Sequence, residues 1–152
     1  MPAKITVRKA APEDLEELLR IQGQSMPQAA EWSAGALLEG LEGCLAAQQN
    51  DRLVGFLLYR ELGSTEWEIL NLAVDQQSRR QGVASSLIEK FLGEAHGDVY
   101  LEVRESNLAA RALYACWGFS EEGLRRAYYH RPVENAVVMK RANKNIPPAN
   151  EA

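Results

Sequence analysis

The sequence has few of the features that mark specialised classes of protein. Its 152 residues include only two cysteines, Cys44 and Cys116, and these are far apart, which argues against a disulfide framework or a zinc site. No run of lysine and arginine is present and the formal net charge is −4, so no nucleic-acid surface is expected. No apolar run is long enough to span a membrane, and the N-terminus lacks a signal-peptide pattern. We therefore expect a cytoplasmic protein without metal, nucleic acid or membrane contacts, and both monomer and dimer stay open.

The composition is that of an ordinary globular chain. Hydrophobic residues make up 46% and charged residues 25%, and this length can bury a core without help from disulfides or metals. We expect a single domain over residues 1–142. Residues 143–152, which are polar and contain two prolines, are expected to form a flexible C-terminal tail.

Hydrophobic spacing predicts an alternation of strands and helices. The expected strands lie at residues 4–8, 44–48, 53–59, 67–74, 98–103, 123–130 and 136–140. The expected helices begin at Pro12, follow a cap at Ser33, follow a glycine turn at residues 79–84, and span Leu108–Trp117 before Gly118. The order βααβββαβαββ indicates an α+β fold, a mixed sheet with helices on both faces.

The turn between the strand at 67–74 and the following helix is the main candidate for a binding site. A strand, a turn and a helix start aim several backbone N–H groups at one point, which suits a phosphate. A Walker loop is absent, and a dinucleotide loop would need three glycines after the first strand of a parallel unit. This turn has one glycine, Gly82, after antiparallel strands. A phosphate loop of another kind and an ordinary turn with two exposed arginines, Arg79 and Arg80, both remain open.

The residues of this turn and of the segments beyond it resemble one family. Arg79-x-x-Gly82-x-Ala84 is similar to the acyl-CoA pyrophosphate loop of the GNAT N-acetyltransferases, Gln/Arg-x-x-Gly-x-Gly/Ala. The acceptor half of the same family is resembled by two later segments, Leu101-Glu-Val-Arg-Glu-Ser-Asn107 and Ala112-Leu-Tyr-Ala-Cys-Trp-Gly-Phe119. Asn71-Leu-Ala-Val-Asp75 and Arg125-Arg-Ala-Tyr-Tyr129 are similar to its bacterial ribosomal-protein-alanine N-acetyltransferase (RimI-like) group. The resemblance implies the GNAT acyl-CoA N-acyltransferase fold and an enzyme that uses acetyl-CoA.

The resemblance also implies which residues hold the cofactor. The pyrophosphate would lie on the backbone of Arg80, Gln81, Gly82, Val83, Ala84 and Ser85, where small residues let the backbone approach closely. Leu72, Ala73 and Val74 would run beside the pantetheine arm, with one backbone N–H polarising the acetyl carbonyl. Asn107 would contact the same arm. The alternative role for Leu72 and Val74 is a core strand, and for Asn107 a helix N-cap.

Two residues are candidates for the proton transfers. Glu102 interrupts an apolar strand, which is costly unless its carboxylate faces a wet cleft or a partner, and it is the expected base. Its alternative is a solvated face of the sheet. By resemblance, Tyr114 lies near the thioester sulfur and stabilises the leaving thiolate, whereas its spacing alone favours a core aromatic.

The acceptor expected from the resemblance is a protein N-terminal α-amine, specifically the N-terminal alanine of a small ribosomal subunit protein, attacked directly without a cysteine nucleophile. A small amine, an amino acid or a lysine side chain are alternatives, and so is a non-catalytic acyl-CoA-binding module. Trp32-Ser33 falls in the expected acceptor loop, where Glu31 replaces the usual proline. Tyr128 and Tyr129 either wall the peptide cleft or fill the sheet. Cys116 is expected to pack on its helix.

Overall fold

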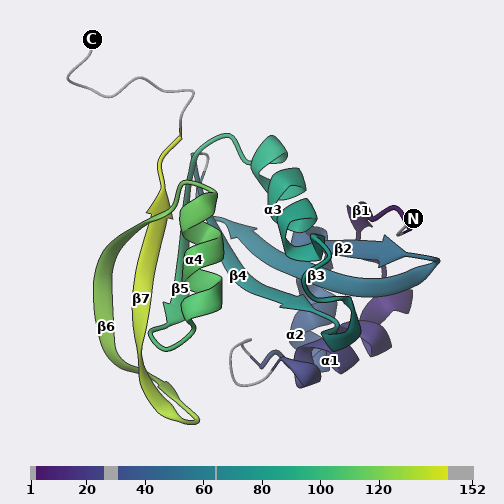
Figure 1. Cartoon of the computed structure of the whole chain (residues 1–152), viewed down its shortest axis with the longest axis horizontal. Coiled ribbons are helices and arrows are strands. Elements are labelled where there is room, and N and C mark those ends of the chain that lie inside the picture. The colour runs from purple at the N-terminus through teal and green to yellow at the C-terminus, as the bar shows by residue number, and fades with distance from the viewer. Residues whose placement is uncertain (1–2, 26–30, 64, 144–152) are drawn as a thin grey trace. The chain divides into compact units, whose positions relative to one another are not determined.

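The computed structural model describes residues 3–25, 31–63 and 65–143, and its ribbon is shown in Figure 1. The strands are β1 (Thr6–Lys9), β2 (Cys44–Gln49), β3 (Arg52–Glu61), β4 (Glu66–Val74), β5 (Asp98–Arg104), β6 (Ser120–His130) and β7 (Val133–Arg141). The helices are α1 (Leu15–Gln24), α2 (Ala34–Glu39), α3 (Val83–Glu94) and α4 (Leu108–Cys116), with short 3-10 turns at Pro12–Asp14, Leu41–Gly43 and Gln76–Ser78. This is the expected order of elements, with boundaries shifted by at most three residues.

Contacts divide the chain into two compact units, the first formed by Met1–Arg60 and Ile69–Glu94 and the second by Glu61–Glu68 and Ala95–Ala152. Strand β4 begins in the second unit and continues in the first. The expectation of one domain over residues 1–142 stays a prediction. The expected tail lies outside the described residues beyond Asn143.

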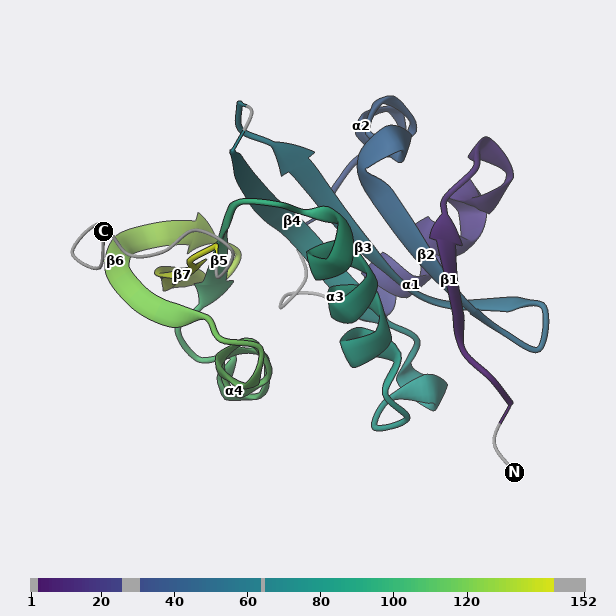
Figure 2. The same ribbon diagram turned by 90° about the horizontal axis from the view of Figure 1, so that it is seen from above.

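The first unit is a sheet with helices on both of its faces. Its strands follow the order β1-β2-β3-β4, and β2 is antiparallel to both β1 and β3. Figures 1 and 2 show α1 and α2 on one face and α3 on the other. The core under α1 and α2 contains Leu18, Ile21, Leu37, Phe56 and Leu58, all at most 2% exposed. The hairpin turn between β2 and β3 is formed by Asn50 and Asp51, both with positive φ, as a two-residue hairpin turn requires.

A glycine lets the sheet and α3 approach each other closely. A Cβ added to Gly55 of β3 would lie 2.8 Å from Val83 Cγ1 and 3.0 Å from the Ala73 carbonyl oxygen. Val83 is the first residue of α3 and is 1% exposed. The contact at Gly55 therefore fixes where α3 starts relative to β3 and β4.

The second unit is a sheet in the order β5-β7-β6 with α4 beside it. Strand β7 is antiparallel to β5 and to β6, and the pairing with β6 shifts between Arg125 and Tyr129, where Ala127 has a φ of 49°. Helix α4 starts at the Asn107 cap, and Gly118, with a φ of 90°, follows its end as expected. In the described part of the chain, no helix combines the length and the apolar character needed to cross a membrane.

Candidate functional site

The glycine turn links β4 to α3 in the first unit. After Asp75 the chain makes the 3-10 turn Gln76–Ser78 and then passes two residues with left-handed backbone, Arg80 with a φ of 65° and Gly82 with a φ of 86°. The Gly82 carbonyl accepts hydrogen bonds from the backbone N–H of Ser86 at 3.0 Å and from its hydroxyl at 2.9 Å. Residues 79–82 are exposed, so this turn presents its backbone to the outside.

This turn fits an anionic group. The first N–H groups of α3, which belong to Val83, Ala84 and Ser85, have no acceptor within the helix by its geometry, and the helix dipole favours negative charge at this end. A Cβ added to Gly82 would meet nothing within 4 Å, so the space in front of its backbone is open. The backbone can thus approach a pyrophosphate, as expected of Arg80 to Ser85.

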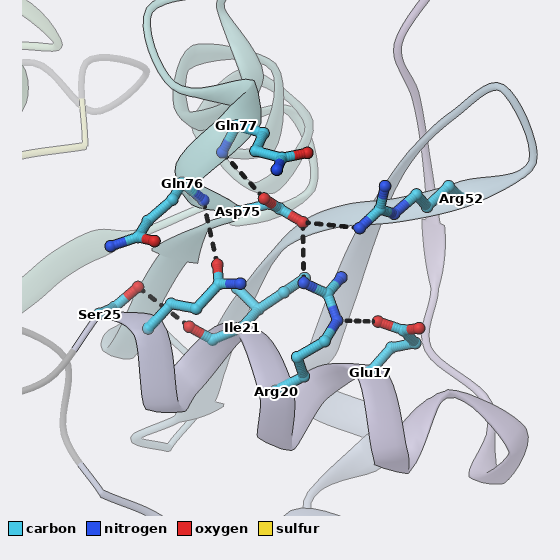
Figure 3. A network of polar contacts seen from close by, with 9 residues as sticks. Glu17, Arg20, Ile21, Ser25, Arg52, Asp75, Gln76 and Gln77 are labelled. Atoms are coloured by element: carbon cyan, nitrogen blue, oxygen red, sulfur yellow. Dashed lines mark hydrogen bonds and ion pairs between the residues drawn. The ribbon is translucent and has the colours of Figure 1, made fainter.

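Asp75 holds the beginning of this turn, in the network that Figure 3 shows. Its side chain is 3% exposed, Oδ1 accepts the Gln77 N–H at 2.9 Å, and Oδ2 lies 2.9 Å from Nη1 of Arg20 on α1. Arg52 of β3 lies further away, at 3.7 Å, and Arg20 also pairs with Glu17. The carboxylate therefore joins the turn to α1 and β3.

A second bond from α1 reaches the same turn. Gln24 Oε1 accepts the backbone N–H of Gln76 at 3.0 Å. Burial by itself would raise the pKa of Asp75, but the Gln77 N–H and the positive charges of Arg20 and Arg52 outweigh it and lower this pKa. Asp75 is therefore ionised in the folded protein at neutral pH. In the sequence Asp75 is only the last residue of a strand motif, and nothing local pairs it with Arg20.

The expected oxyanion donors lie on β4. Ala73 is buried in the core, while Leu72 and Val74 are half-buried. The Leu72 N–H donates to Oδ1 of the preceding Asn71 at 3.0 Å, so this amide has a side-chain partner in the free protein. The role of a β4 backbone N–H in polarising the acetyl carbonyl stays a prediction.

Gln22 of α1 ties β4 to the segment before α2. Its Oε1 accepts the Trp32 N–H at 3.1 Å and lies 3.4 Å from the Asn71 Nδ2, and its Nε2 donates to the Trp32 carbonyl at 2.9 Å. Gln22 is 4% exposed and Asn71 6%. Ser33 caps α2 by accepting the Ala36 N–H at 3.1 Å, as expected. Trp32 is thus held in place by backbone bonds to a buried side chain, which sequence analysis did not detect.

Glu102 lies on β5 in the second unit and is not on a solvated face. Its side chain is 16% exposed, and Oε1 lies 3.0 Å from Nε of Arg125 on β6. Oε2 is buried and, in the part of the chain that the structure describes, has no hydrogen-bond partner. Leaving a buried carboxylate oxygen unpaired is costly, so Glu102 is not fully stabilised by its partners within the described chain.

Two tyrosines of β6 surround this carboxylate. A side-chain hydrogen bond to Glu102, and then burial, raise the pKa of the Tyr128 phenol, and burial followed by the Glu102 charge raises the pKa of Tyr129 to about 12. The two rings meet edge to face at 5.1 Å. The Arg104 guanidinium lies 4.3 Å from the Tyr129 ring centroid and is fixed by the carbonyls of Arg131 and Pro132. Both phenols thus interact with Glu102, and the two possible roles of Tyr128 and Tyr129 stay predictions.

Tyr114 of α4 is 6% exposed and contacts Phe119 with ring centroids 5.5 Å apart. Burial, and then the neighbouring Tyr129, raise the pKa of Tyr114, so its hydroxyl stays protonated across the neutral range. Tyr129 therefore interacts electrostatically with both Tyr114 and Glu102. A core aromatic and a proton donor are compatible roles for this residue.

Asn107 is the N-cap of α4, since its Oδ1 accepts the Ala110 N–H at 3.2 Å. This is the alternative role considered for it, and its cofactor contact stays a prediction. Cys116 is exposed, so the expectation that it packs is wrong, because it lies on a side of α4 that faces solvent. Cys44 is buried, which raises the pKa of its thiol to about 12. Among the described residues no group of three or more His, Cys, Asp or Glu could hold a metal ion.

The expected site residues thus fall into two sets. Leu72–Val74 and the loop from Arg80 to Ser85 belong to the first unit. Glu102, Asn107 and Tyr114 belong to the second unit. Each set is organised by residues that sequence analysis did not single out for this purpose: Arg20, Gln22, Asn71, Asp75, Arg104 and Arg125.

Known proteins resemble this chain over most of its length. Residues 9–119 match the profile of the acetyltransferase (GNAT) family. The N-alpha-acetyltransferase RimI of Mycobacterium tuberculosis is 39% identical over 101 residues, which are 64% of each chain. An uncharacterized protein of Mycobacterium leprae is 34% identical over 145 residues, covering 90% of this chain and 40% of that protein. The present chain therefore spans less than two thirds of the length of these two relatives.

A solved structure extends the likeness to the fold. The ribosomal-protein-S18-alanine N-acetyltransferase of Escherichia coli superimposes with a TM-score of 0.82 and 28% sequence identity, over 97% of this chain and 98% of that one. The expected fold, a mixed sheet flanked by helices, is confirmed by this agreement.

Proposed function

The chain belongs to the GNAT acetyltransferase family, and from this we propose that it transfers the acetyl group of acetyl-CoA to the N-terminal α-amine of a protein. The acceptor that we infer is the N-terminal alanine of a small-subunit ribosomal protein, the substrate class named for the Escherichia coli relative. We further expect it to act in the cytoplasm. The observation that carries the proposal is the Glu102 carboxylate, largely buried, with one oxygen unpaired among the described residues.

The glycine turn is proposed to hold acetyl-CoA, which supplies an acetyl thioester. Backbone N–H groups from Arg80 to Ser85 would bind the pyrophosphate, and the open space at Gly82 lets the backbone come close. A backbone N–H of β4 would donate to the acetyl carbonyl oxygen and stabilise the negative charge that develops there. The Asp75 network keeps the turn in place.

Glu102 is proposed to receive the proton of the acceptor. The amine nitrogen attacks the carbonyl carbon directly, a C–N bond forms, and the excess proton passes to Glu102, directly or through one water molecule. The C–S bond then breaks and the sulfur leaves as a thiolate. Tyr114, which is protonated at neutral pH, stabilises that thiolate mainly by donating a hydrogen bond, because its raised pKa opposes full transfer. Protons and electron pairs balance, since Glu102 takes the proton of the amine, and solvent later removes it and protonates the released thiolate.

A weak base suits an α-amine better than a lysine. An N-terminal amine has a pKa near 8, so a good fraction is neutral at physiological pH, whereas deprotonating a lysine with a pKa near 10.4 costs about 3–4 kcal/mol at pH 7.5–8. A glutamate with an ordinary carboxyl pKa is therefore a sufficient base for an N-terminal α-amine. This supports an α-amine over a lysine side chain as the acceptor.

The test is an acetylation assay with peptides that differ in their first residue. The chain is incubated with acetyl-CoA and peptides beginning with alanine, serine, methionine or glycine, each also carrying one internal lysine, and mass spectrometry locates the acetyl group. We expect acetyl on the α-amine, fastest for alanine, and none on the same peptide with a blocked N-terminus. Acetylation of the lysine or of free amino acids at equal rates would contradict the proposal, and coenzyme A binding without any turnover would indicate a binding module.

A further inference from the structure

Glu102 is paired with an arginine that reaches it across another strand. Val138 of β7 pairs with Glu102 of β5 on one side and with Gly123 of β6 on the other. Arg125 lies two residues beyond Gly123, so it points from the same face of β6. Gly123 has no side chain, and a Cβ added there would meet nothing within 4 Å. The Arg125 side chain thus crosses β7 on this face, and the pair closes at 3.0 Å.

The two partners differ strongly in exposure. The Glu102 side chain is 16% exposed, whereas that of Arg125 is 59% exposed. An ion pair with so exposed an arginine adds little net stability, because the arginine loses hydration and rotamer freedom to form it. The guanidinium also lies 5.9 Å from the Tyr128 ring centroid, a contact that it can keep when it leaves the carboxylate. Arg125 is thus held, but weakly.

An incoming amine meets a Glu102 carboxylate in which one oxygen is already paired and the other is buried. Oε1 carries Arg125, and Oε2 is buried from solvent without a partner among the described residues. A cation that approaches from solvent therefore competes with Arg125 for Oε1. The α-ammonium of an acceptor has the same charge and the same N–H donors as the guanidinium edge, so it can take that place.

We propose that Arg125 is a displaceable stand-in for the acceptor, bound to Glu102 until the α-ammonium replaces it, and that this competition weakens acceptor binding. The inference rests on the proposed function, in which Glu102 receives the acceptor amine. Arg125 is a specificity-setting residue in this view, because only an acceptor cation that binds Glu102 better than Arg125 does will engage. It takes no part in the proton transfers.

The first experiment compares Arg125→Gln with Arg126→Gln, a control that removes the same charge from the neighbouring exposed residue. We expect Arg125→Gln to lower KM for an alanine-initiated peptide about two- to fivefold, with kcat changed less than twofold, and Arg126→Gln to leave both unchanged. Arg125→Lys, which keeps the charge on a shorter chain, should give an intermediate KM. A raised KM in Arg125→Gln, a tenfold loss of kcat at constant KM, or equal effects of the two glutamine variants would each overturn the proposal.

The second experiment needs no turnover. The Nε–H resonance of Arg125 is followed by 15N NMR in the presence of coenzyme A, which carries no acetyl group. Adding the alanine-initiated peptide should move this resonance to the position that it has in Glu102→Gln, and the same peptide with an acetylated N-terminus should not. If the wild-type protein acetylates the peptide while the resonance stays in place, the displacement is refuted and the proposed function stands. If no peptide is acetylated and none moves the resonance, the proposed function itself is refuted and the stand-in role is refuted with it.

Discussion

Replacing Asp75 with asparagine removes one charge from the network of Figure 3 and keeps its shape. Asparagine Oδ1 can still accept the Gln77 N–H, so the cap of the 3-10 turn survives. The substitution removes the charge from the hydrogen bond between Arg20 Nη1 and the side-chain oxygen 2.9 Å away. A hydrogen bond between charged groups contributes about 1.5–3 kcal/mol, and the 31% exposure of Arg20 places this one at the lower end.

The expected loss of stability for Asp75→Asn is therefore about 2 kcal/mol, with less than 1 kcal/mol of it from the more distant and more exposed Arg52. In a chain of this length that corresponds to a fall in Tm of roughly 4–8 °C. The turn that leads to Gly82 would also be less well held. Because binding must then order this turn, the affinity for coenzyme A should fall about fivefold, or about 1 kcal/mol.

The assays are thermal unfolding and titration calorimetry with coenzyme A. Glu17→Gln is the matched control, because it removes the other carboxylate on Arg20 without touching the turn, and it should change Tm by less than 2 °C, as expected for an exposed pair worth under about 0.5 kcal/mol. An unchanged Tm and coenzyme A affinity in Asp75→Asn would refute the reasoning. Equal effects of both variants would show that α1 is destabilised and that the turn is not the element affected.

The same network predicts a pH dependence. The pKa of Asp75 is lowered in the folded state, so its contribution is fully present above the unfolded pKa, near 3.9, and is lost as the pH falls through the lower folded value. The difference in Tm between the wild type and Asp75→Asn should thus be constant from about pH 5 to 8 and shrink below about pH 4. A difference as large at pH 3 as at pH 7 would contradict the ionic origin of the stabilisation.

Four further substitutions test the remaining assignments. Glu102→Gln should lower kcat by about 10²-fold or more with coenzyme A affinity unchanged in calorimetry, since a general base contributes about this much. Tyr114→Phe should also lower kcat, by about tenfold or more, at every pH from 6 to 9, because the raised pKa keeps the phenol protonated there. Gly82→Ala should cost about 1–2 kcal/mol in chemical unfolding, from its φ of 86°, and weaken coenzyme A binding. Gly55→Ala should cost about 1–3 kcal/mol, because its Cβ would meet Val83 at 2.8 Å, and full stability would show that α3 can shift freely.

The order of elements and most turns could be predicted from local sequence. Asn50-Asp51 adopts the left-handed conformation that a two-residue hairpin turn needs, Ser33 and Asn107 cap their helices, and Gly118 follows the last helix. These signals are local because one residue's φ or one side-chain oxygen decides each of them. The prediction that Cys116 packs was wrong because helical spacing alone does not indicate which side of a helix contacts a sheet.

The site residues were predicted by motif, and their partners were not. Glu102 and Tyr114 were identified from their segments, but the pair with Arg125 joins residues on two strands separated by a third. Gln22 and Asn71 are likewise distant in sequence, and Asn71 Nδ2 donates to Gln22 Oε1 in a buried hydrogen bond. The spacing of residues in the sequence cannot predict such pairs, because they depend on strand register and on the placement of a helix over a sheet.

Local sequence is enough to specify the elements, their order and the turn that is open to a phosphate, because glycine, capping residues and apolar spacing act over a few residues. The tertiary structure adds that Asp75 anchors this turn through Arg20, and that one oxygen of Glu102 is held by Arg125 while the other is buried. These features depend on the fold because the desolvation and pairing of a charge are set by the side chains that the fold brings around it.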